Sequence, residues 1–453
     1  MKSISPVSAE LICIFQAHTN AEIENAIINA HNAFKTWRNY SFERRASCFK
    51  KAATILRDNA VEHATMISQE MGKSFKEALA EIEKCAVCCD YYAEHGATLL
   101  QNESISTAAQ KSYISYQPLG VILSIMPWNF PYWQVFRFAA PTLMAGNTAL
   151  LKHASNVSGC SVAIEKIFID AGFLEHTFQS LLVKSTDIEP IIAHPLVQAV
   201  TLTGSTQAGS SVAQLCGKYI KKSVLELGGS DPYLILEDAD LESAAELCVQ
   251  SRTLNAGQSC IAAKRFLVME SVYERFVSLF VDKMRAIRMG DPFSAQTHIG
   301  PMATHALRDE LHKQVTRSIQ LGANCLLGGE LPDNVGAYYP ATVLSNVKPG
   351  MPAFEEELFG PVASIIKVKT QKEAIEIANA SHFGLGSAVF TQDIAKGQHI
   401  AEHELQSGNC FVNDFVRSDP RLPFGGIKQS GYGRELAHCG IREFCNIKTV
   451  YIK

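Results

Sequence analysis

The sequence has no apolar run long enough to cross a membrane. Its longest apolar stretches, such as Leu119 to Met126, fall far short of the ~20 residues that a membrane-spanning helix needs. Near the N-terminus, the only apolar run, Leu11 to Phe15, is too short for the core of a signal peptide, and no small-residue cleavage pattern follows it. We therefore expect a cytoplasmic protein that does not enter a membrane.

The chain also lacks a dominant charge, an internal repeat and any low-complexity segment. Its formal net charge is −4, and no cluster of Lys and Arg stands out, so we expect no nucleic-acid partner. Hydrophobic residues make up 47% and charged residues 19%, as in a folded globular enzyme rather than a disordered chain. A length of 453 residues predicts two to four domains.

Cysteine is plentiful, but a disulfide or metal framework is missing. The 13 cysteines are odd in number and irregular in spacing, which disfavours a set of disulfides. Cys85, Cys88 and Cys89 contain one C-x-x-C pair, whereas a zinc site needs a second pair or histidines at ligand spacing. We expect no metal, and we expect most cysteines to pack as small hydrophobic residues.

The order of predicted elements indicates an α/β fold. Residues 21–37 and 41–85 carry apolar residues at helical spacing, and each segment follows an Asn or Ser that suits a helix cap. From residue 119 to 230, short apolar runs alternate with helical segments, which predicts a parallel sheet with helices on both faces. Such sheets often bind nucleotides at the carboxyl ends of their strands.

A second α/β unit is predicted after about residue 231. Helical patterns cover 274–290 and 309–323, and strand patterns cover 338–347, 363–370 and 387–392. Residues 111–117 alternate like an exposed strand, and residues 444–453 resemble a closing strand.

Three residues are candidates for covalent chemistry. Cys260, in NAGQSC, fits a loop-to-helix junction, where a helix N-terminus would lower the thiol pKa; the alternative is a buried core cysteine. Glu226 ends an apolar strand, where burial would raise its pKa and suit a general base; the alternative is a carboxylate facing solvent. Asn129 lies between two prolines, so its amide could hold an oxyanion or could simply form a turn.

A second group of residues is a candidate for nucleotide binding. In LTGSTQAG, the residues Gly204, Ser205 and Gly209 follow a strand and open a helix, so backbone amides could approach a pyrophosphate. The pattern is not G-x-G-x-x-G and is weak by itself. Lys152 ends a buried strand and points either to a ligand or to water.

Taken in order, the motifs resemble those of the aldehyde dehydrogenase superfamily. They are PWNFP, LKHAS, LTGS, LELGGSDP, GQSC, EELFGPV and LPFGGIKQSGYGRE, which run from residue 127 to residue 435. The segments YQPLGVILSIMPWNFPYWQVFRFAAP, KHASNV and SDPRLPFGG are similar to those of short bacterial succinate-semialdehyde dehydrogenases.

The resemblance implies two doubly wound parallel-sheet domains and a small oligomerisation extension. The NAD(P)-binding domain would comprise 1–99 and 118–228, the catalytic domain 229–428, and the oligomerisation segments 100–117 and 429–453. The implied assembly is a homodimer or homotetramer.

The resemblance also implies a reaction, the oxidation of succinic semialdehyde to succinate. Cys260 would form a thiohemiacetal and then a thioester, Asn129 would hold the oxyanion together with a backbone N–H near Cys260, and Glu226 would activate water. In the family, Lys152 matches a residue on the adenosine ribose, Gly204 and Ser205 face the pyrophosphate, Glu357 and Phe359 hold the nicotinamide ribose, and Trp128 lines the cofactor cleft. No metal is implied, because the cofactor is the electron acceptor.

Several positions that depart from the family pattern lead to expectations about cofactor and substrate specificity. NAD-preferring members often carry Glu where this chain has Ser155; a serine removes the repulsion of a 2′-phosphate, so we expect NADP+ to be preferred and NAD+ tolerated. Arg137 matches the arginine that binds the substrate carboxylate, with a helix-face salt bridge as the alternative. Ser259 and Ser418 are candidate hydroxyl donors to the same carboxylate. Leu254 stands where some relatives have a second arginine, which leaves room for a longer or less polar aldehyde.

Other functions stay open at this point. The chain could oxidise another semialdehyde or an aliphatic aldehyde. A cysteine esterase that needs no cofactor could use the same Cys, Glu and Asn, but the nucleotide-binding motifs would then be unexplained. A non-catalytic role would require the loss of one of these three residues, and all three are present.

Overall fold

Helices account for most of the first hundred residues, as their apolar spacing predicts. They are α1 Asn20–Trp37, α2 Phe42–Asp58, α3 Ala60–Met71 and α4 Phe75–Leu99. Ser41 caps α2 as expected, but α1 already begins at Asn20 and is capped by Thr19, which forms a capping box with Glu22. The helical pattern over 41–85 is interrupted because Gly72 adopts a left-handed conformation (φ +79°) that ends α3.

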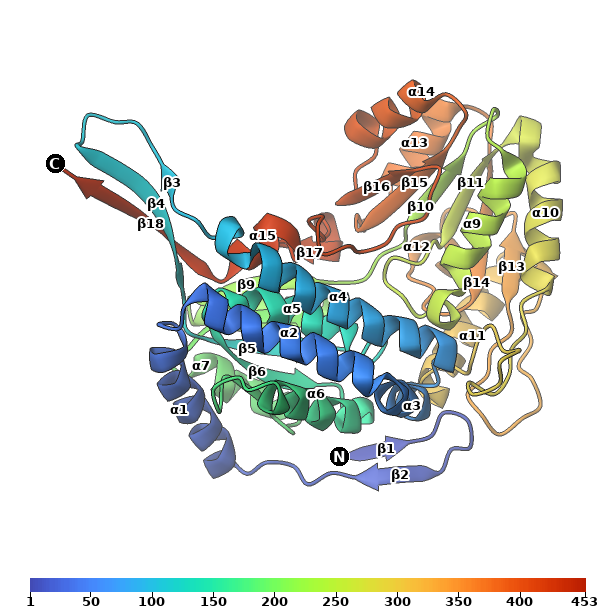
Figure 1. Cartoon of the computed structure of the whole chain (residues 1–453). Helices are drawn as coiled ribbons and strands as arrows, with labels where there is room; N and C mark the ends of the chain where they lie inside the picture. Colours follow the sequence, from blue (N-terminus) through green and yellow to red (C-terminus); the bar gives the residue numbers. More distant parts are fainter.

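A six-stranded sheet forms the first α/β unit of the structure, a computed structural model that describes residues 1–453 (Figure 1). Its strand order is β17-β9-β8-β5-β6-β7, and all neighbours are parallel except β17, which is antiparallel to β9. The strands are β5 Val121–Met126, β6 Thr148–His153, β7 Phe178–Ser180, β8 Val197–Thr203, β9 Lys222–Glu226 and β17 Gly431–Tyr432. The helices between them are α5 Trp133–Met144, α6 Ser158–Asp170, α7 Ile188–Ala193 and α8 Thr206–Lys218. The β-α-β alternation predicted over residues 119–230 is therefore confirmed.

A seven-stranded sheet forms the second unit, with the order β12-β13-β14-β11-β10-β15-β16. Only the β12–β13 pair is antiparallel. The strands are β10 Pro232–Ile235, β11 Arg265–Met269, β12 Asn324–Leu327, β13 Thr342–Ser345, β14 Val362–Val368, β15 Gly386–Phe390 and β16 Asn409–Val412. The helices are α9 Leu241–Thr253, α10 Tyr273–Arg285, α11 His305–Gln320, α12 Pro352–Glu355, α13 Gln371–Asn379 and α14 Ile394–His399. None of the helices in the chain combines the length and apolar character that a membrane crossing requires.

A three-stranded arm projects from the first unit (Figure 1). It pairs β18 Cys445–Ile452 with β4 Lys111–Pro118 along their whole length, and β3 Glu103–Ser104 completes the sheet. The two ranges expected to form one extension, 100–117 and 429–453, thus meet in the arm. The second range is not wholly in the arm, because β17 joins the six-stranded sheet and helix α15 Ala437–Glu443 leads from it to β18.

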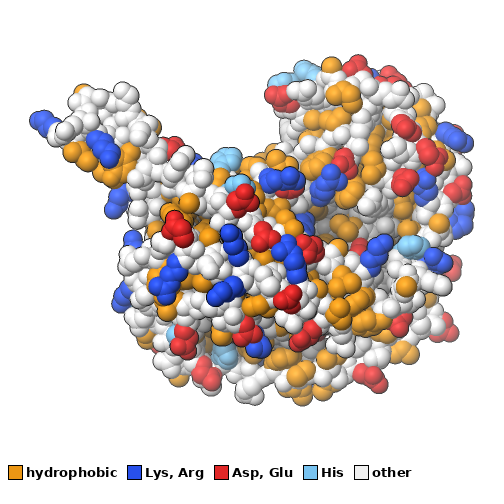
Figure 2. Space-filling view, viewed as in Figure 1, with side chains coloured by type: hydrophobic (Ala, Val, Ile, Leu, Met, Phe, Trp, Pro, Cys, Tyr) orange, Lys and Arg blue, Asp and Glu red, His pale blue; other side chains and the backbone are white.

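The N-terminus forms a separate two-stranded hairpin, β1 Lys2–Ile4 with β2 Leu11–Ile14. Figure 2 shows Lys, Arg, Asp and Glu side chains interspersed over the face displayed, with no broad patch of one sign. Cys85, Cys88 and Cys89 lie in α4 and are fully buried in the main hydrophobic core, which fits their expected role as small hydrophobic residues.

Candidate active site

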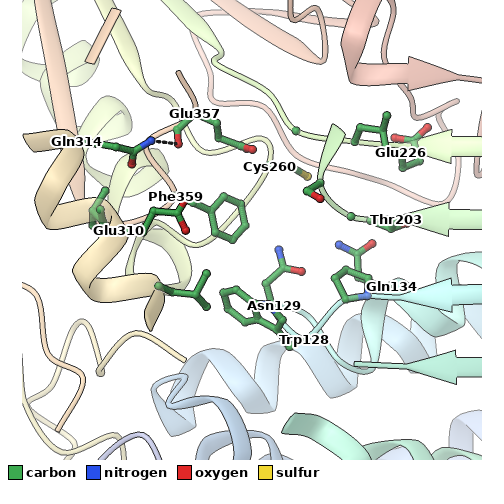
Figure 3. Close-up of a pocket in the computed structure, with 17 residues that line it drawn as sticks. Trp128, Asn129, Gln134, Thr203, Glu226, Cys260, Glu310, Gln314, Glu357 and Phe359 are labelled. Atoms are coloured by element: carbon green, nitrogen blue, oxygen red, sulfur yellow. Dashed lines mark hydrogen bonds between the residues drawn. The ribbon is translucent and has the colours of Figure 1, made fainter. Parts of the chain in front are cut away.

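A cavity of about 260 Å³ lies between the two units, at the carboxyl ends of β8 and β9 (Figure 3). The predicted residues that line it are Trp128, Asn129, Gly204, Ser205, Glu226, Cys260, Glu357 and Phe359. They come from the loop after β5, the ends of β8 and β9, the turn before β11 and the loop after α12. The first sheet thus presents the carboxyl ends of its strands to the cavity, whereas the residues from the second unit lie in the segments that precede β11 and β14.

The loop that carries Cys260 has an unusual backbone. Asn255, Ala256 and Gly257 all have φ between +52° and +73°, a conformation that non-glycine residues rarely adopt. Gly257 also packs so closely that a Cβ atom there would lie 2.2 Å from the Gly360 carbonyl oxygen. No helix follows Cys260; the turn leads into β11 at Arg265. The expected loop-to-helix junction was therefore wrong.

The environment of the thiol also differs from that expectation. Burial raises the pKa of Cys260 to about 12, while the positive charges of Arg137 and Lys264 act in the opposite direction. The resting thiol is protonated at neutral pH, so a nearby base or an added positive charge has to favour the thiolate. The N–H of Cys260 donates no hydrogen bond within the protein, so it is a free donor beside the sulfur.

Lys264 holds this loop from the inside. Its ammonium donates to the carbonyl oxygens of Ser259 (3.1 Å), Cys260 (2.8 Å) and Ala262 (3.2 Å). It also lies 3.5 Å from Oε1 of Glu357, which accepts a hydrogen bond from the Gly229 N–H. The Lys264 side chain is 1% exposed, so these charge-assisted contacts are shielded from water. Lys264 thereby links the nucleophile loop to a residue on the expected cofactor side.

Asn129 is tied to the same loop. Its Nδ2 donates to the Gln258 carbonyl oxygen at 3.1 Å, and its own carbonyl oxygen accepts from Asn255 Nδ2 at 2.7 Å. An amide nitrogen has two hydrogens, so one stays available to the cavity. Figure 3 shows the Asn129 amide and the Cys260 sulfur turned towards the same space. The position matches that expected for an oxyanion donor.

Glu226 ends β9 as predicted and is buried without a hydrogen-bond partner for either carboxylate oxygen. Burial raises its pKa well above the usual value; Glu435 adds to the rise, and Arg137 opposes it. Gly425 permits this placement, because a Cβ atom there would lie 2.7 Å from Glu226 Oε1. An unpaired carboxylate with a raised pKa is suited to take a proton near neutral pH.

Arg137 is already paired within the protein. Its guanidinium forms a buried ion pair with Glu435, donates to Thr203 Oγ1 at 3.4 Å and lies over the Phe424 ring. Arg137 is not among the residues that line the cavity. The salt bridge considered as the alternative from sequence is what the structure contains, although the partner is a buried glutamate rather than a residue on the helix face. Glu435 therefore already neutralises the charge that the sequence analysis assigned to the substrate carboxylate.

The opposite side of the cavity is suited to a dinucleotide. Gly204 and Ser205 lie between β8 and α8, and the Ser205 hydroxyl caps α8 by accepting from the Ala208 N–H. The N-terminus of this helix thus faces the cavity and favours negative charge. Across the opening, the rings of Trp128 and Phe359 meet edge to face, with centroids 5.8 Å apart.

Three predicted cofactor residues lie outside the cavity lining. Lys152 is in β6; it has no ion-pair or hydrogen-bond partner, and burial lowers its pKa. Ser155 follows β6 in a short 3-10 turn and is exposed. Gly209 is buried in α8: its N–H donates to the Ser205 carbonyl oxygen at 2.9 Å, and a Cβ atom there would lie 2.5 Å from the side chain of Leu227, which follows β9. The expectation of a pyrophosphate contact at Gly209 is corrected accordingly.

The predicted hydroxyl donors Ser259 and Ser418 also lie outside the cavity lining, and both are buried. Ser259 is next to the nucleophile, and its carbonyl oxygen accepts from Lys264. Ser418 instead accepts from Lys84 Nζ at 2.8 Å and from Trp133 Nε1 at 3.1 Å.

Several residues of the site escaped the sequence analysis. In the cavity these are Gln134, Thr203, Leu307, Glu310, Leu311 and Gln314, together with Pro127, Leu227 and Gly228 beside recognised motifs. Thr203 could have been found, since it ends β8 directly before Gly204. Glu310 and Gln314 belong to one face of α11, whose sequence resembles any exposed amphipathic helix.

Comparison with known proteins shows the family of this chain. Residues 1–450 match the model of the aldehyde dehydrogenase family, and the chain belongs to that family. Two curated relatives are each 47% identical to this chain, over 99% of this chain and 99% of the relative. One is a probable succinate-semialdehyde dehydrogenase [NADP(+)] from Synechocystis. The other is succinate-semialdehyde dehydrogenase [NADP(+)] 1 from Mycobacterium tuberculosis.

The structure is also similar to solved structures of the family. It matches the crystal structure of succinic semialdehyde dehydrogenase from Streptococcus pyogenes in complex with NADP+ with a TM-score of 0.97 and 35% identity, over 100% of this chain and 99% of that one. The predicted family and fold class are thus confirmed.

Proposed function

We propose that the protein oxidises succinic semialdehyde to succinate with NADP+. The observation that carries the proposal is one cavity that combines Cys260, Asn129 and Glu226 with the N-terminal end of α8. A thiol, an amide donor and an unpaired carboxylate suit acyl chemistry on an aldehyde, and a helix N-terminus suits a phosphate group. The relatives named for the same reaction agree with this function.

The residues divide the reaction into two half-reactions. The Cys260 sulfur adds to the aldehyde carbon, and the oxyanion receives hydrogen bonds from Asn129 Nδ2 and the Cys260 N–H. After oxidation of the thiohemiacetal, Glu226 takes a proton from a water molecule that attacks the thioester. Succinate leaves, and the sulfur regains its proton.

The chain's residues fit a bound dinucleotide. Lys152 is a half-buried ammonium without a partner, a suitable ligand for ribose or phosphate oxygens. Exposed Ser155 lies three positions further on and would accept a 2′-phosphate without repulsion. Gly204 and Ser205 would face the pyrophosphate, and Glu357 and Phe359 the nicotinamide ribose. When bound, NADP+ supplies the hydride acceptor.

The domain ranges given above and the homo-oligomer are part of the same proposal. The exposed strand β18 lies at the edge of the arm's sheet, so a second subunit could extend that sheet. Location in the cytoplasm stays a prediction from the sequence.

The test is an initial-rate measurement at the absorbance band of reduced nicotinamide. Wild-type protein and Cys260→Ala are assayed with succinic semialdehyde, butanal and pentanal, each with NADP+ and with NAD+. We expect the highest kcat/KM for succinic semialdehyde with NADP+, and no turnover by the variant. A higher kcat/KM for a neutral aldehyde would replace the substrate proposal, and ester hydrolysis without any dehydrogenase activity would replace the reaction.

A further inference from the structure

Asn255 joins the oxyanion side of the cavity to the nucleophile side. Its side-chain Nδ2 donates to the carbonyl oxygen of Asn129 at 2.7 Å and to that of Gln258 at 3.1 Å. The Gln258 carbonyl oxygen also accepts from Asn129 Nδ2, at 3.1 Å. Gln258 and Cys260 belong to the same loop, so the position of Asn255 decides how the Asn129 amide is oriented relative to the sulfur.

The backbone of Asn255 needs an anchor to keep its conformation. It is left-handed, with φ +54°, and the residue is buried. A non-glycine residue keeps such a conformation where the surrounding contacts stabilise it. The contact made by the Asn255 N–H is with a carboxylate, Oε1 of Glu77, at 2.8 Å. A hydrogen bond to a charged acceptor is among the stronger ones in proteins, so Glu77 is the natural anchor.

Glu77 lies in the first turn of α4 and makes this contact from the first unit to the second. Figure 1 shows the N-terminal end of α4 next to the second unit. The Phe75 N–H donates to the carbonyl oxygen of Pro292 at 2.9 Å, which is a further contact of this helix end with the second unit. The other carboxylate oxygen of Glu77 accepts from Ser74 Oγ at 2.9 Å. Both oxygens are therefore occupied, and the carboxylate is fixed in direction.

The next turn of α4 holds the loop that follows β5, which carries the oxyanion donor. Oε1 of Glu81 accepts hydrogen bonds from the N–H groups of Tyr132 and Trp133, both at 2.9 Å. The other oxygen of Glu81 forms a buried ion pair with Lys73. Residues four apart lie on the same face of a helix, so Glu77 and Glu81 hold the two loops at a separation set by α4.

We propose that Glu77 is a positioning residue, which sets the Asn129 amide relative to Cys260 by anchoring Asn255. The inference rests on the proposed chemistry at Asn129 and Cys260, but not on the identity of the aldehyde. Glu77 does not line the cavity, so it acts through Asn255 and not on the substrate. Without its carboxylate, the left-handed turn can relax and displace the oxyanion donor, and a misplacement of about 1 Å costs roughly 100-fold in rate.

Two reactions of the same sulfur separate this role from a general disturbance of the loop. In acylation by p-nitrophenyl acetate, the Cys260 sulfur adds to the ester carbonyl carbon, an oxyanion forms, and p-nitrophenolate leaves. In alkylation by iodoacetamide, the sulfur displaces iodide and no oxyanion forms. Neither reaction needs a cofactor or an aldehyde. A misplaced oxyanion donor therefore slows acylation and leaves alkylation unchanged.

The experiment compares Glu77→Ala and Glu77→Gln with Glu94→Ala, which removes a carboxylate from an exposed position of the same helix. For Glu77→Ala we expect acylation and kcat with succinic semialdehyde to fall about 10- to 100-fold, with alkylation within threefold of wild type. Glu77→Gln keeps an acceptor for the Asn255 N–H and should retain most of the acylation rate, and Glu94→Ala should match wild type. An equal loss in acylation and alkylation, no loss in either, or a Gln variant as slow as the Ala variant would overturn the proposal.

Asn255→Gly is a second variant that does not depend on the folding of Glu77→Ala. Glycine adopts φ +54° readily and keeps the N–H, but it lacks the amide that binds the carbonyl oxygens of Asn129 and Gln258. We expect acylation to be slowed as in Glu77→Ala, and the double variant to stay within threefold of either single one. Losses that multiply would show that Glu77 does not act through Asn255, and would refute the proposal.

The cofactor-free readout also separates this inference from the proposed function. If wild-type protein is acylated but does not oxidise succinic semialdehyde, the proposed function fails, and Glu77 is judged by acylation alone. If oxidation is observed and Glu77→Ala changes neither acylation nor kcat, the inference fails and the proposed function stands.

Discussion

Replacing Lys264 by Met tests whether the nucleophile loop is held by one buried charge. The change keeps a chain of similar length but removes three hydrogen bonds to the carbonyl oxygens of Ser259, Cys260 and Ala262 and the ion pair with Glu357. A hydrogen bond to a charged group contributes roughly 1.5–3 kcal/mol, and removing one partner of a buried pair costs roughly 3–5 kcal/mol. Because these contacts share one ammonium, we expect a total near the upper part of the second range and not their sum.

The effect on activity has two physical sources. Without its clamp the loop, which already holds a left-handed backbone at 255–257, can relax and displace the sulfur; a shift of about 1 Å costs roughly 100-fold in rate. Lys264 also lowers the pKa of the Cys260 thiol, so its removal raises that pKa and reduces the thiolate fraction at a given pH. We therefore expect kcat to fall about 100-fold or more.

The assay combines steady-state kinetics with the pH dependence of Cys260 alkylation by iodoacetamide. In Lys264→Met, alkylation should require a higher pH than in wild type, whereas Lys264→Arg should remain close to wild type. Lys313→Met, at an exposed position of α11, is the matched control and should change neither quantity. If Lys264→Met keeps kcat within threefold and the same alkylation profile, the clamp has no role in positioning or activating the thiol.

Three further outcomes follow from the site. Glu226→Gln should give one rapid equivalent of NADPH per active site and then turn over at least 100-fold more slowly, because thioester hydrolysis loses its base; an unchanged steady state would remove Glu226 from that step. Asn129→Ala should lower kcat by about 100- to 1,000-fold with little change in Cys260 alkylation, as measured by both assays in parallel. Ser155→Glu should reverse the cofactor preference, measured as the ratio of kcat/KM for NADP+ and NAD+; a ratio unaltered by the change would show that the 2′-phosphate lies elsewhere.

Local patterns in the sequence predicted most of the first sheet and its helices and the positions of the main chemical groups, whereas the hairpin of β1 and β2, helix α9 and strands β11, β12 and β16 were not predicted. The alternation of short apolar runs with helical segments gave both sheets, because each parallel strand needs a crossover helix. Glu226 and Ser205 could be placed from sequence, since a strand end and a helix N-cap are local features. Cys260 was chosen correctly as a residue of the cavity, but not for its environment.

The errors share one physical origin. Whether Cys260 meets a helix N-terminus or a buried turn depends on how 255–264 folds back, and that turn is held by Lys264 and by contacts with Asn129 and Gly360. The sequence pattern around Gly209 is typical of a phosphate-binding loop, whereas in the structure Gly209 packs against Leu227, the residue that follows β9. The contacts of the 255–264 turn and of Gly209 join residues far apart in the sequence, so the local pattern of residues does not predict them.

The sequence by itself determined the family and the fold class and predicted the three reacting groups, because their motifs are short and lie within one element or turn. Only the tertiary structure decided which cations are free. Arg137 finds Glu435, and Lys84 finds Ser418 across 334 residues of chain, through contacts between elements that no local spacing encodes. Burial in a shared interior then sets which of these charges is already neutralised, since an ion removed from water depends on the few groups packed around it.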